Sequence, residues 1–427
     1  AGDSDNRAVV AEIVALRAEH ARLLGYETFA AYALADTMAK SPEQVAGLLE
    51  GVWPKAVARA REECATLQDV VRSEGGNFKI APWDWRHYAE KVRRARFDLD
   101  EAEVRPYFEL DSMIEAAFDC ASRLFGLSFE PRPDLKLHNP DARAWEVTGR
   151  KGEHVGLFIG DYFARPSKRS GAWMSAFRSQ HKLGKGQRPV IINVLNIARG
   201  AEGQPTLLSF DDARTLFHEF GHGLHGLLSD VTYPSIAGTE VSRDFVELPS
   251  QLYEHWLSRP EVLKRFAVHA RTKKPIPESL LKRLKAARNF NQGFATVEYT
   301  ASALVDMRLY ALKDTKGLDI GVFERQALAE IGMPPEIIMR HRLPHFMHIM
   351  GGYAAGYYSY LWSEVMDADA FAAFEEAGDI FDKKTARKLH DFIYSAGNLR
   401  DPHAAYVAFR GRAPKIDSLL QKRGFDV

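Results

Sequence analysis

The sequence has little cysteine. Two cysteines, Cys64 and Cys120, occur among 427 residues. Two are too few for a disulfide framework or a thiolate zinc site, so we expect both to be small buried side chains. Two cysteines fit a reducing compartment but are too few to decide it. We expect the cytoplasm, with the periplasm as the alternative because we expect the true N-terminus to lie outside this chain.

The sequence also lacks an excess of either charge and any long apolar run. Its 57 Lys and Arg balance its 57 Asp and Glu. A broad nucleic-acid-binding surface needs a basic excess, so we expect no nucleic-acid partner. No stretch reaches the roughly 18 consecutive apolar residues of a membrane-spanning helix, so we expect no membrane association. With 46% hydrophobic residues, the chain has enough apolar material for a folded core.

The beginning of the chain lacks an initiator Met and the basic and apolar regions of a signal peptide. The polar AGDSDN leads directly into a segment with helical apolar periodicity. Such a beginning is typical of an interior piece, so we expect a fragment or a processed form of a longer protein. Internal repeats and low-complexity linkers are also absent from the sequence. We therefore expect one unit that is mainly α, with a small inserted β-sheet.

The pattern divides this unit into three segments. Residues 1–127 are predicted to be helical; Ser41, followed by Pro42, is typical of a helix start, and this helix should run to about Ser73. Residues 128–208 are predicted to be β-rich, and residues 209–427 helical again. Short β-branched or aromatic runs bounded by turn residues predict the strands, over 143–148, 154–160, 189–194 and, with less support, 171–174.

The strongest motif is the H-E-x-x-H sequence His218-Glu219-Phe220-Gly221-His222. Ser209, with acidic residues after it, caps a predicted helix that contains the motif. Residues four apart lie on one helix face, about 6 Å apart along the axis, so His218 and His222 can share one Zn²⁺. Glu219 points to the adjacent side, where it can take a proton from a water held by the metal. The motif predicts a zinc hydrolase with one ion per chain.

Two glycines interrupt this helix, and a third histidine follows them. Gly221 and Gly223 each cost roughly 1 kcal/mol relative to Ala, which indicates close approach of another segment or a substrate. His225 faces almost the same way as His218 but lies about 10 Å along the axis, too far to share the metal. His225 and Leu228 also occupy the places where the metzincin pattern needs Gly and His. We therefore expect His225 to be a packed or supporting side chain.

The third metal ligand must come from outside the motif. Glu240, Glu247 and Glu254 follow at heptad spacing. Glu240 falls in a connecting loop, whereas Glu247 and Glu254 share one face of the next predicted helix. Pro249 would kink or start that helix. Spacing alone does not choose among the three carboxylates.

A second set of candidate residues lies in the segment 348–362, which combines one His, four Tyr and three Gly. Peptide hydrolysis at a metal needs donors for the oxyanion of the tetrahedral intermediate, and Tyr hydroxyls and His suit that task. The glycines Gly351, Gly352 and Gly356 favour a mobile loop. The alternative is an aromatic-rich packed helix with Tyr357, Tyr360 and Trp362 in the core.

Several motifs together resemble the thimet oligopeptidase family of zinc metallopeptidases. They are FHEFGHGLHGLL, RDFVELPSQLYEHW, GDYFARPSKRSGAWMSAF and GGYAAGYYSYLWSEV. The resemblance covers nearly the whole chain and is closest to the bacterial peptidyl-dipeptidase, or dipeptidyl carboxypeptidase, branch. Members of the family are longer, with an N-terminal helical lobe that helps to wall a deep channel. The resemblance therefore implies a helical body that lines one side of such a channel, with the N-terminal lobe absent from this chain and present as a separate or cleaved chain.

The resemblance also implies roles for particular residues. The metal ligands would be His218, His222 and Glu247. Glu219 would be the general base. Transition-state stabilisation would fall to Tyr360 and His348. Substrate contacts would come from the aromatic segment and from a strand that pairs with the substrate backbone, at Tyr353, Tyr357, Gly171 and Ala172.

The function that the resemblance implies is zinc-dependent hydrolysis of short peptides, with release of dipeptides from the C-terminus. The first alternative is an endo-acting oligopeptidase of the same family, whose products would have mixed lengths. The second is an inactive peptide-binding fragment, which would bind zinc and peptide without turnover.

Overall fold

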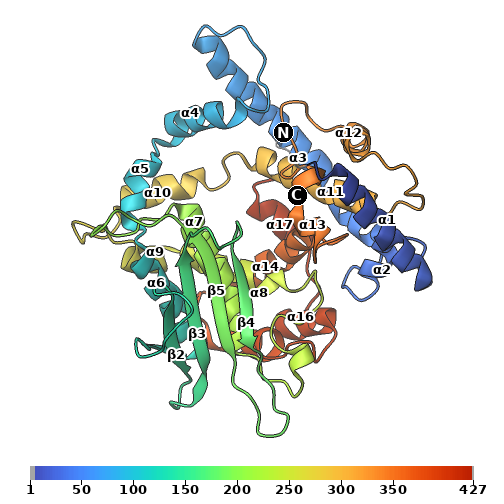
Figure 1. The fold of residues 1–427 in the computed structure, drawn as a ribbon. Helices are drawn as coiled ribbons and strands as arrows, with labels where there is room; N and C mark the ends of the chain where they lie inside the picture. Colours follow the sequence, from blue (N-terminus) through green and yellow to red (C-terminus); the bar gives the residue numbers. More distant parts are fainter. Residues whose placement is uncertain (1–4, 426–427) are drawn as a thin grey trace.

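The computed structural model describes residues 5–425, so residues 1–4 of the polar beginning AGDSDN lie outside the described part. Within that part, the chain forms 17 α-helices and one five-stranded sheet, and the sheet lies in the lower half of the view with helices above and behind it (Figure 1). The prediction of a mainly α body with a small inserted sheet is confirmed. The described chain contains no helix with both the length and the apolar character needed to cross a membrane.

Six helices precede the sheet. The longest of them, α3, begins as the sequence predicts: the Ser41 hydroxyl accepts the Gln44 N–H, and Pro42 occupies the first turn. It ends at Ser73, and Gly75 then takes a left-handed conformation with φ of 80°. The helices are α1 (Arg7–Leu23), α2 (Phe29–Leu34), α3 (Pro42–Ser73), α4 (Trp85–Phe97), α5 (Glu101–Val104) and α6 (Leu110–Phe125).

The sheet is mixed, in the order β1-β2-β3-β5-β4. Only the β3–β5 pair is parallel among the described strands. Strand β4 therefore lies at an edge, with one side free of sheet pairing. The strands are β1 (Ser128–Pro131), β2 (Arg143–Thr148), β3 (His154–Phe163), β4 (Trp173–Arg178) and β5 (Val190–Ile197).

The strand predicted over 171–174 was placed too early. Gly171 has φ of +89°, outside the range of a strand. The Asn196 side chain donates hydrogen bonds to the carbonyls of Arg169 and Gly171, at 2.8 and 2.7 Å, and holds them as a loop. The strand consequently begins at Trp173. Strand β1 was not predicted.

Eleven α-helices follow the sheet. They are α7 (Phe210–Leu227), α8 (Glu247–Leu257), α9 (Pro260–Phe266), α10 (Glu278–Ala287), α11 (Gln292–Tyr310), α12 (Ile320–Glu330), α13 (Met347–Met350), α14 (Ser359–Glu376), α15 (Lys383–Leu389), α16 (Pro402–Arg410) and α17 (Ile416–Lys422). Shorter 3₁₀ turns and one π-helical turn occur at η1 (Arg105–Tyr107), η2 (Pro234–Ile236), η3 (Leu343–His345) and η4 (His390–Tyr394).

Helix α7 lies between the sheet and α8, packed against both. On the sheet side, the Phe220 ring lies 5.1 Å from the Phe158 ring of β3 and 5.3 Å from that of Phe118 on α6. These contacts belong to the largest apolar core of the molecule. The core thus fixes α7 on one side, and the H-E-x-x-H residues that face away from the sheet are held rigidly.

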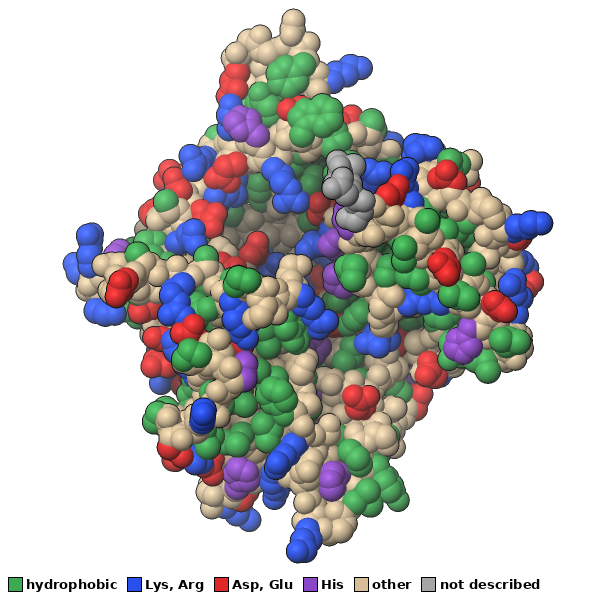
Figure 2. All heavy atoms as spheres, viewed as in Figure 1, with side chains coloured by type: hydrophobic (Ala, Val, Ile, Leu, Met, Phe, Trp, Pro, Cys, Tyr) green, Lys and Arg blue, Asp and Glu red, His purple; other side chains and the backbone are tan. Residues whose placement is uncertain are grey.

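The face shown in Figure 2 is hollowed in its upper half. In Figure 1 the same place is the interval between α4, α10 and α7. Lys, Arg, Asp and Glu side chains mix around the rim of this hollow (Figure 2). Side chains of both charges therefore occur at this opening.

Candidate metal centre

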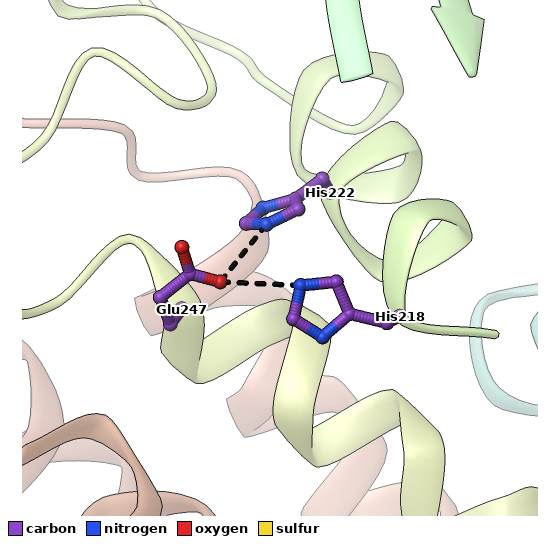
Figure 3. A group of neighbouring side chains, drawn as sticks. All are labelled: His218, His222 and Glu247. Atoms are coloured by element: carbon purple, nitrogen blue, oxygen red, sulfur yellow. Dashed lines mark hydrogen bonds and ion pairs between the residues drawn. The ribbon is translucent and has the colours of Figure 1, made fainter. Parts of the chain in front are cut away.

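Three side chains from two helices converge on one point (Figure 3). His218 and His222 project from α7, and Glu247 is the first residue of α8. Glu247 Oε2 lies 3.1 Å from His222 Nε2 and 3.3 Å from His218 Nε2. Two ligands of a tetrahedral Zn²⁺, each at about 2.0–2.1 Å, lie about 3.3 Å from one another, so the spacing fits such an ion. The three residues can hold a metal ion.

Gly221 allows the two helices to approach closely enough for this convergence. A Cβ on Gly221 would lie 2.7 Å from both the Pro249 carbonyl oxygen and the Ser250 Cα of α8. Those atoms are backbone, which cannot move aside cheaply. The expectation that another segment approaches the helix closely is confirmed here. Gly223 faces the sheet instead, where its Cβ would lie 3.3 Å from Asn193 and Phe158.

A second carboxylate lies behind His218. Glu254 Oε1 is 2.7 Å from His218 Nδ1, the ring nitrogen that faces away from Glu247. A carboxylate in this position fixes the tautomer and the ring orientation of a metal-binding histidine. Of the three heptad-spaced acids, Glu247 therefore joins the two Nε2 atoms and Glu254 supports one ring. Glu240 is exposed in the connection between the helices.

The electrostatics of the cluster keep Glu247 anionic. Burial raises the pKa of Glu247, but the charges and hydrogen bonds of His222 and His218 outweigh it and hold the pKa well below its usual value. Ser250 adds a hydrogen bond from its hydroxyl to Oε2 at 3.0 Å. Burial lowers the pKa of His218, but the carboxylates of Glu247 and Glu254 prevail and raise it well above its usual value. The site is thus built to favour a positive charge between these side chains.

Glu219 lies beside the two histidines with an unused oxygen. Its side chain is 5% exposed, and within residues 5–425 its Oε2 has no hydrogen-bond partner. Burial raises its pKa, and the neighbouring charges of His218 and His222 oppose that shift. A buried carboxylate oxygen without a partner costs free energy unless a water or a substrate group meets it. Glu219 therefore fits the general-base role predicted for it.

His225 matches the expectation of a packed side chain. It is fully buried, and in the described chain neither ring nitrogen has a hydrogen-bond partner. Burial, together with the charge of His222, lowers its pKa to about 3. Its ring packs edge-on against Tyr394, with centroids 6.2 Å apart. The neutral imidazole acts as part of the core.

The aromatic segment meets the cluster through Tyr353. The Tyr353 hydroxyl donates to Glu247 Oε1, the oxygen that does not face the histidines. The Tyr353 ring stacks on the Tyr360 ring, with centroids 5.3 Å apart and planes 11° apart. Tyr357 lies edge-on to Tyr360 at 5.5 Å and to His348 at the same distance. The structure therefore brings together the four aromatic and histidine candidates and one of the metal-site residues.

This segment is mostly turn and not a continuous packed helix. Helix α13 ends at Met350, and α14 does not begin until Ser359. Tyr357 is nevertheless buried in the second apolar core, as the packed-helix alternative predicted for it. Tyr360 lies on α14, and its burial raises the pKa of its hydroxyl well above the usual value. That hydroxyl therefore stays protonated and available as a donor at neutral pH.

Gly171 and Ala172 lie immediately before the edge strand β4. Gly171 is exposed, and Ala172 packs partly against the main core. Met174 on the same strand reaches α7, since a Cβ on Gly226 would lie 2.7 Å from Met174 Cε. Among the contacts described, none joins Gly171 or Ala172 to the His218–His222–Glu247 cluster. Their contact with a substrate backbone stays a prediction.

Three contributors to this region were missed by the sequence reasoning. The Arg243 guanidinium lies over the Tyr353 ring, 4.7 Å from its centroid. Ser250 supports Glu247 from three residues further along α8. The spacing of Ser250 from Glu247, and the place of Arg243 directly before the segment Asp244–Glu247, were visible signals. Asp306, which binds the backbone of the aromatic segment, lies 49 residues away from Ala355 and had no such signal.

The chain is similar to two bacterial peptidases over nearly its whole length. Dipeptidyl carboxypeptidase of Escherichia coli (strain K12) is 43% identical over 428 residues, which are 99% of this chain and 63% of that protein. Oligopeptidase A of the same organism is 37% identical over 433 residues, with 99% and 63% covered. The chain thus spans 63% of the length of these curated relatives.

Solved structures show the same fold at low sequence identity. A carboxypeptidase of Pyrococcus furiosus superposes with a TM-score of 0.56 at 15% identity, over 98% of this chain and 73% of that one. An M32 carboxypeptidase of Deinococcus radiodurans R1 gives a TM-score of 0.54 at 14% identity, over 98% and 74%. Residues 1–425 match Peptidase family M3. The family resemblance drawn from the sequence is therefore confirmed, and the chain belongs to Peptidase family M3.

Proposed function

We propose that this chain hydrolyses short peptides with one zinc ion held by His218, His222 and Glu247. The observation that carries the proposal is the convergence of two Nε2 atoms on Glu247 Oε2, at 3.1 and 3.3 Å, beside the unpartnered Oε2 of Glu219. A binding module needs the ligands but has no use for the buried carboxylate. Zinc, when bound, supplies Lewis-acid chemistry that lowers the pKa of water and polarises a carbonyl.

Glu219 performs the proton transfers in this proposal. Its Oε2 takes a proton from the attacking water, and the same oxygen then delivers that proton to the nitrogen of the leaving amine. Burial raises the pKa of Glu219, which makes the carboxylate a better base. Glu254 and Ser250 keep His218 and Glu247 in their orientations during these transfers.

Tyr360, with His348 and Tyr353, supplies donors for the oxyanion. The Tyr360 hydroxyl is kept protonated by burial, as a donor must be. The Tyr353 hydroxyl is engaged with Glu247 Oε1 in this structure, so it would have to exchange that partner for the substrate. Tyr357, Gly171 and Ala172 are the proposed substrate contacts, the last two through backbone pairing beside the edge strand.

We propose release of C-terminal dipeptides as the specificity. Dipeptidyl carboxypeptidase of Escherichia coli is more similar to this chain than oligopeptidase A is, at 43% against 37% identity. Exo-acting cleavage also requires a cation for the terminal carboxylate of the substrate. Arg243, which lies over the Tyr353 ring next to Glu247, is our candidate for that cation. An endo-acting oligopeptidase, for which no such cation is needed, is the alternative.

Partners and compartment follow from the same proposal. The partner is a short peptide, and the channel that would exclude folded proteins stays a prediction. The expected separate or cleaved chain with an N-terminal lobe gains no support from the comparisons. The cytoplasm also stays a prediction, with the periplasm as its alternative.

The test of catalysis is Glu219→Gln, assayed on a short unblocked peptide. We expect turnover to fall by about 10²–10⁴-fold while zinc binding stays unchanged. Equal turnover in the variant and the parent would overturn the mechanism. A parent chain that binds zinc and peptide but releases no product would instead support the peptide-binding alternative. Mass spectrometry of the products would show dipeptides alone for the exo-acting enzyme and mixed lengths for the endo-acting one.

A further inference from the structure

A buried carboxylate accepts hydrogen bonds from the backbone of the aromatic segment, residues 348–362. Asp306, on α11, is fully buried. Its Oδ1 accepts the Ala355 N–H and its Oδ2 accepts the Tyr357 N–H, each at 3.0 Å. Ala355 has φ of +52°, a left-handed conformation that is unfavourable for a residue with a Cβ. The two hydrogen bonds hold the chain in that conformation.

A second group on the same helix holds the other side of the turn. The Tyr299 hydroxyl donates to the Tyr357 carbonyl and accepts the Leu361 N–H at 3.2 Å. Tyr299 lies seven residues before Asp306, so both side chains leave one face of α11 two turns apart. Two side chains of α11 therefore fix the backbone between Ala355 and Leu361 by hydrogen bonds.

This turn sets the directions of the tyrosines on either side of it. Tyr353 precedes the turn and Tyr360 follows it, yet their rings stack at 5.3 Å. Seven residues of extended chain would separate them by more than 20 Å, so the stack requires the compact turn over residues 351–358, which contains the left-handed Ala355. In the same compact turn, the Tyr353 hydroxyl reaches Glu247.

We propose that Asp306 is a positioning residue for the reaction: its ionised carboxylate fixes the left-handed turn at Ala355 and so aims Tyr353 and Tyr360 at the metal centre. Among the described contacts, Asp306 has none with His218, His222 or Glu247, and it meets the proposed substrate contact Tyr357 through the backbone N–H of that residue. The role of the tyrosines in turnover rests on the function proposed above. The role of Asp306 in ordering the turn does not.

The ionisation of Asp306 adds a dependence on pH. Burial raises its pKa to about 7, against the lowering effect of the N–H groups that it binds. Arg17 from α1 is the charged group that acts on it, and the titratable groups around it are the hydroxyls of Tyr310, Tyr357 and Tyr358. A protonated carboxyl has one acceptor fewer for the two N–H groups. The turn is therefore held most tightly above about pH 7.

The test is Asp306→Asn, read out by hydrogen exchange of peptides that cover residues 351–358. An amide in place of the carboxylate leaves one of the two N–H groups without an acceptor. We expect exchange in this segment to accelerate by about tenfold or more, and the acceleration to be smaller at pH 6 than at pH 8. The zinc dissociation constant should rise no further than it does in Tyr353→Phe, since the loosened turn costs Glu247 only its contact with the Tyr353 hydroxyl.

Glu63→Gln is the matched control. Glu63 also accepts two backbone N–H groups, those of Gly293 and Phe294, at 2.9 and 2.8 Å, but at the opposite end of α11. It should leave exchange in residues 351–358 unchanged. Equal acceleration in the two variants would show a general loosening of α11 and would overturn the proposal, as would unchanged exchange in Asp306→Asn.

Ala355→Gly provides a rescue, since Gly adopts positive φ without strain. Added to Asp306→Asn, it should return at least half of any lost kcat and leave KM unchanged. Lost kcat without rescue, in a variant whose segment exchanges like the parent, would place the effect of Asp306 elsewhere. A parent chain without turnover would refute the proposed function, whereas the exchange measurements would still decide the role of Asp306.

Discussion

The Nδ1 atom of His218 is hydrogen-bonded to Glu254 Oε1 at 2.7 Å. This bond fixes the ring so that the opposite nitrogen, Nε2, points toward Glu247. Two carboxylates seven residues apart on α8 thus act on the two sides of one imidazole. Glu247 contributes to the candidate ligand set, and Glu254 contributes orientation and basicity.

Replacement of Glu254 by Gln should weaken metal binding and leave the fold intact. Gln keeps an acceptor for Nδ1 but removes the negative charge that makes the ring a better ligand. We expect zinc affinity to fall by about 10–100-fold. Competition with a chelating dye measures the dissociation constant directly.

Glu240→Gln is the control for Glu254, because Glu240 belongs to the same heptad series but is exposed away from the cluster. It should bind zinc as the parent does. A Glu254→Gln variant with the affinity of the parent would show that His218 is oriented by packing alone.

Gly221 sets the distance between α7 and α8. In Gly221→Ala, the new Cβ would meet backbone atoms of Pro249 and Ser250 at 2.7 Å, so the helices must separate. We expect a loss of stability of about 1–3 kcal/mol in spite of the better helix propensity of Ala. Zinc affinity should fall as well, since Glu247 begins the helix that is displaced.

The control for Gly221 is Gly47→Ala in the second turn of α3, where a Cβ meets no atom within 4 Å. There the same exchange should stabilise the protein, by up to about 1 kcal/mol. Urea unfolding of the two variants and the parent gives the comparison. If Gly221→Ala proves as stable as Gly47→Ala, the close approach of the helices does not limit the site.

Some of this architecture was predictable from local sequence, and some was not. Strand β2 has the predicted bounds, 143–148, because its signal lies within the strand itself. The strand expected over 171–174 was displaced by Asn196, a distant side chain that holds Gly171 in a loop. Local patterns contain no information about such a contact.

The candidate site shows the same limit. The pair His218 and His222 follows from helical spacing alone. The heptad spacing of the acids did not identify which of three carboxylates joins the two histidines. The different positions of Glu247 and Glu254 at the cluster depend on the angle at which α8 meets α7. The aromatic segment can form its turn because Asp306, far away in sequence, accepts the Ala355 N–H. This hydrogen bond offsets the free-energy cost of the positive φ of Ala355.

Asp161 should make the free energy of unfolding depend measurably on pH in the acid range. It is buried and hydrogen-bonded to Arg165 at 2.7 and 2.6 Å, with the buried ammonium of Lys168 at 2.8 Å. Burial raises the pKa of Asp161, but these cations and His138 hold it well below its usual value. Asp161→Asn leaves Lys168 buried without its counter-ion, and we expect a loss of about 3 kcal/mol at pH 7.

The sign of the pH dependence follows from the lowered pKa. The unfolded carboxyl titrates near pH 4, so the stabilisation by Asp161 is fully present above that value and is lost as pH falls through the lower native pKa. The stability gap between parent and Asp161→Asn should therefore be constant from about pH 5 to 7 and shrink below pH 4. Asp134→Asn, in an exposed pair with Arg132, should show no such gap. A gap that widens in acid would contradict the assignment.

The two stacked tyrosines should differ when each loses its hydroxyl. Tyr360→Phe removes a proposed oxyanion donor, so kcat should fall by about 10²–10³-fold with KM and zinc affinity nearly unchanged. Tyr353→Phe also frees Glu247 Oε1, so both kcat and zinc affinity should fall. Steady-state kinetics and metal titration on both variants separate the roles. Identical behaviour of the two would mean that they act as one stacked unit.

Arg243 decides between the exo-acting and endo-acting proposals. If its guanidinium binds the terminal carboxylate, Arg243→Gln should raise KM for an unblocked peptide by about tenfold or more. The same variant should leave hydrolysis of the C-terminally amidated peptide unchanged, because that substrate has no carboxylate to bind. Arg243→Lys keeps the charge over Tyr353 and should lie between the parent and Gln.

The outcome against this assignment is equally specific. Arg243 also lies over the Tyr353 ring, at 4.7 Å, so its loss could disturb the tyrosine alone. In that case the unblocked and amidated peptides would suffer equally, and Arg243→Lys would be nearly normal for both. Equal losses would therefore assign Arg243 to the support of Tyr353, and mixed-length products from the parent would then establish the endo-acting alternative.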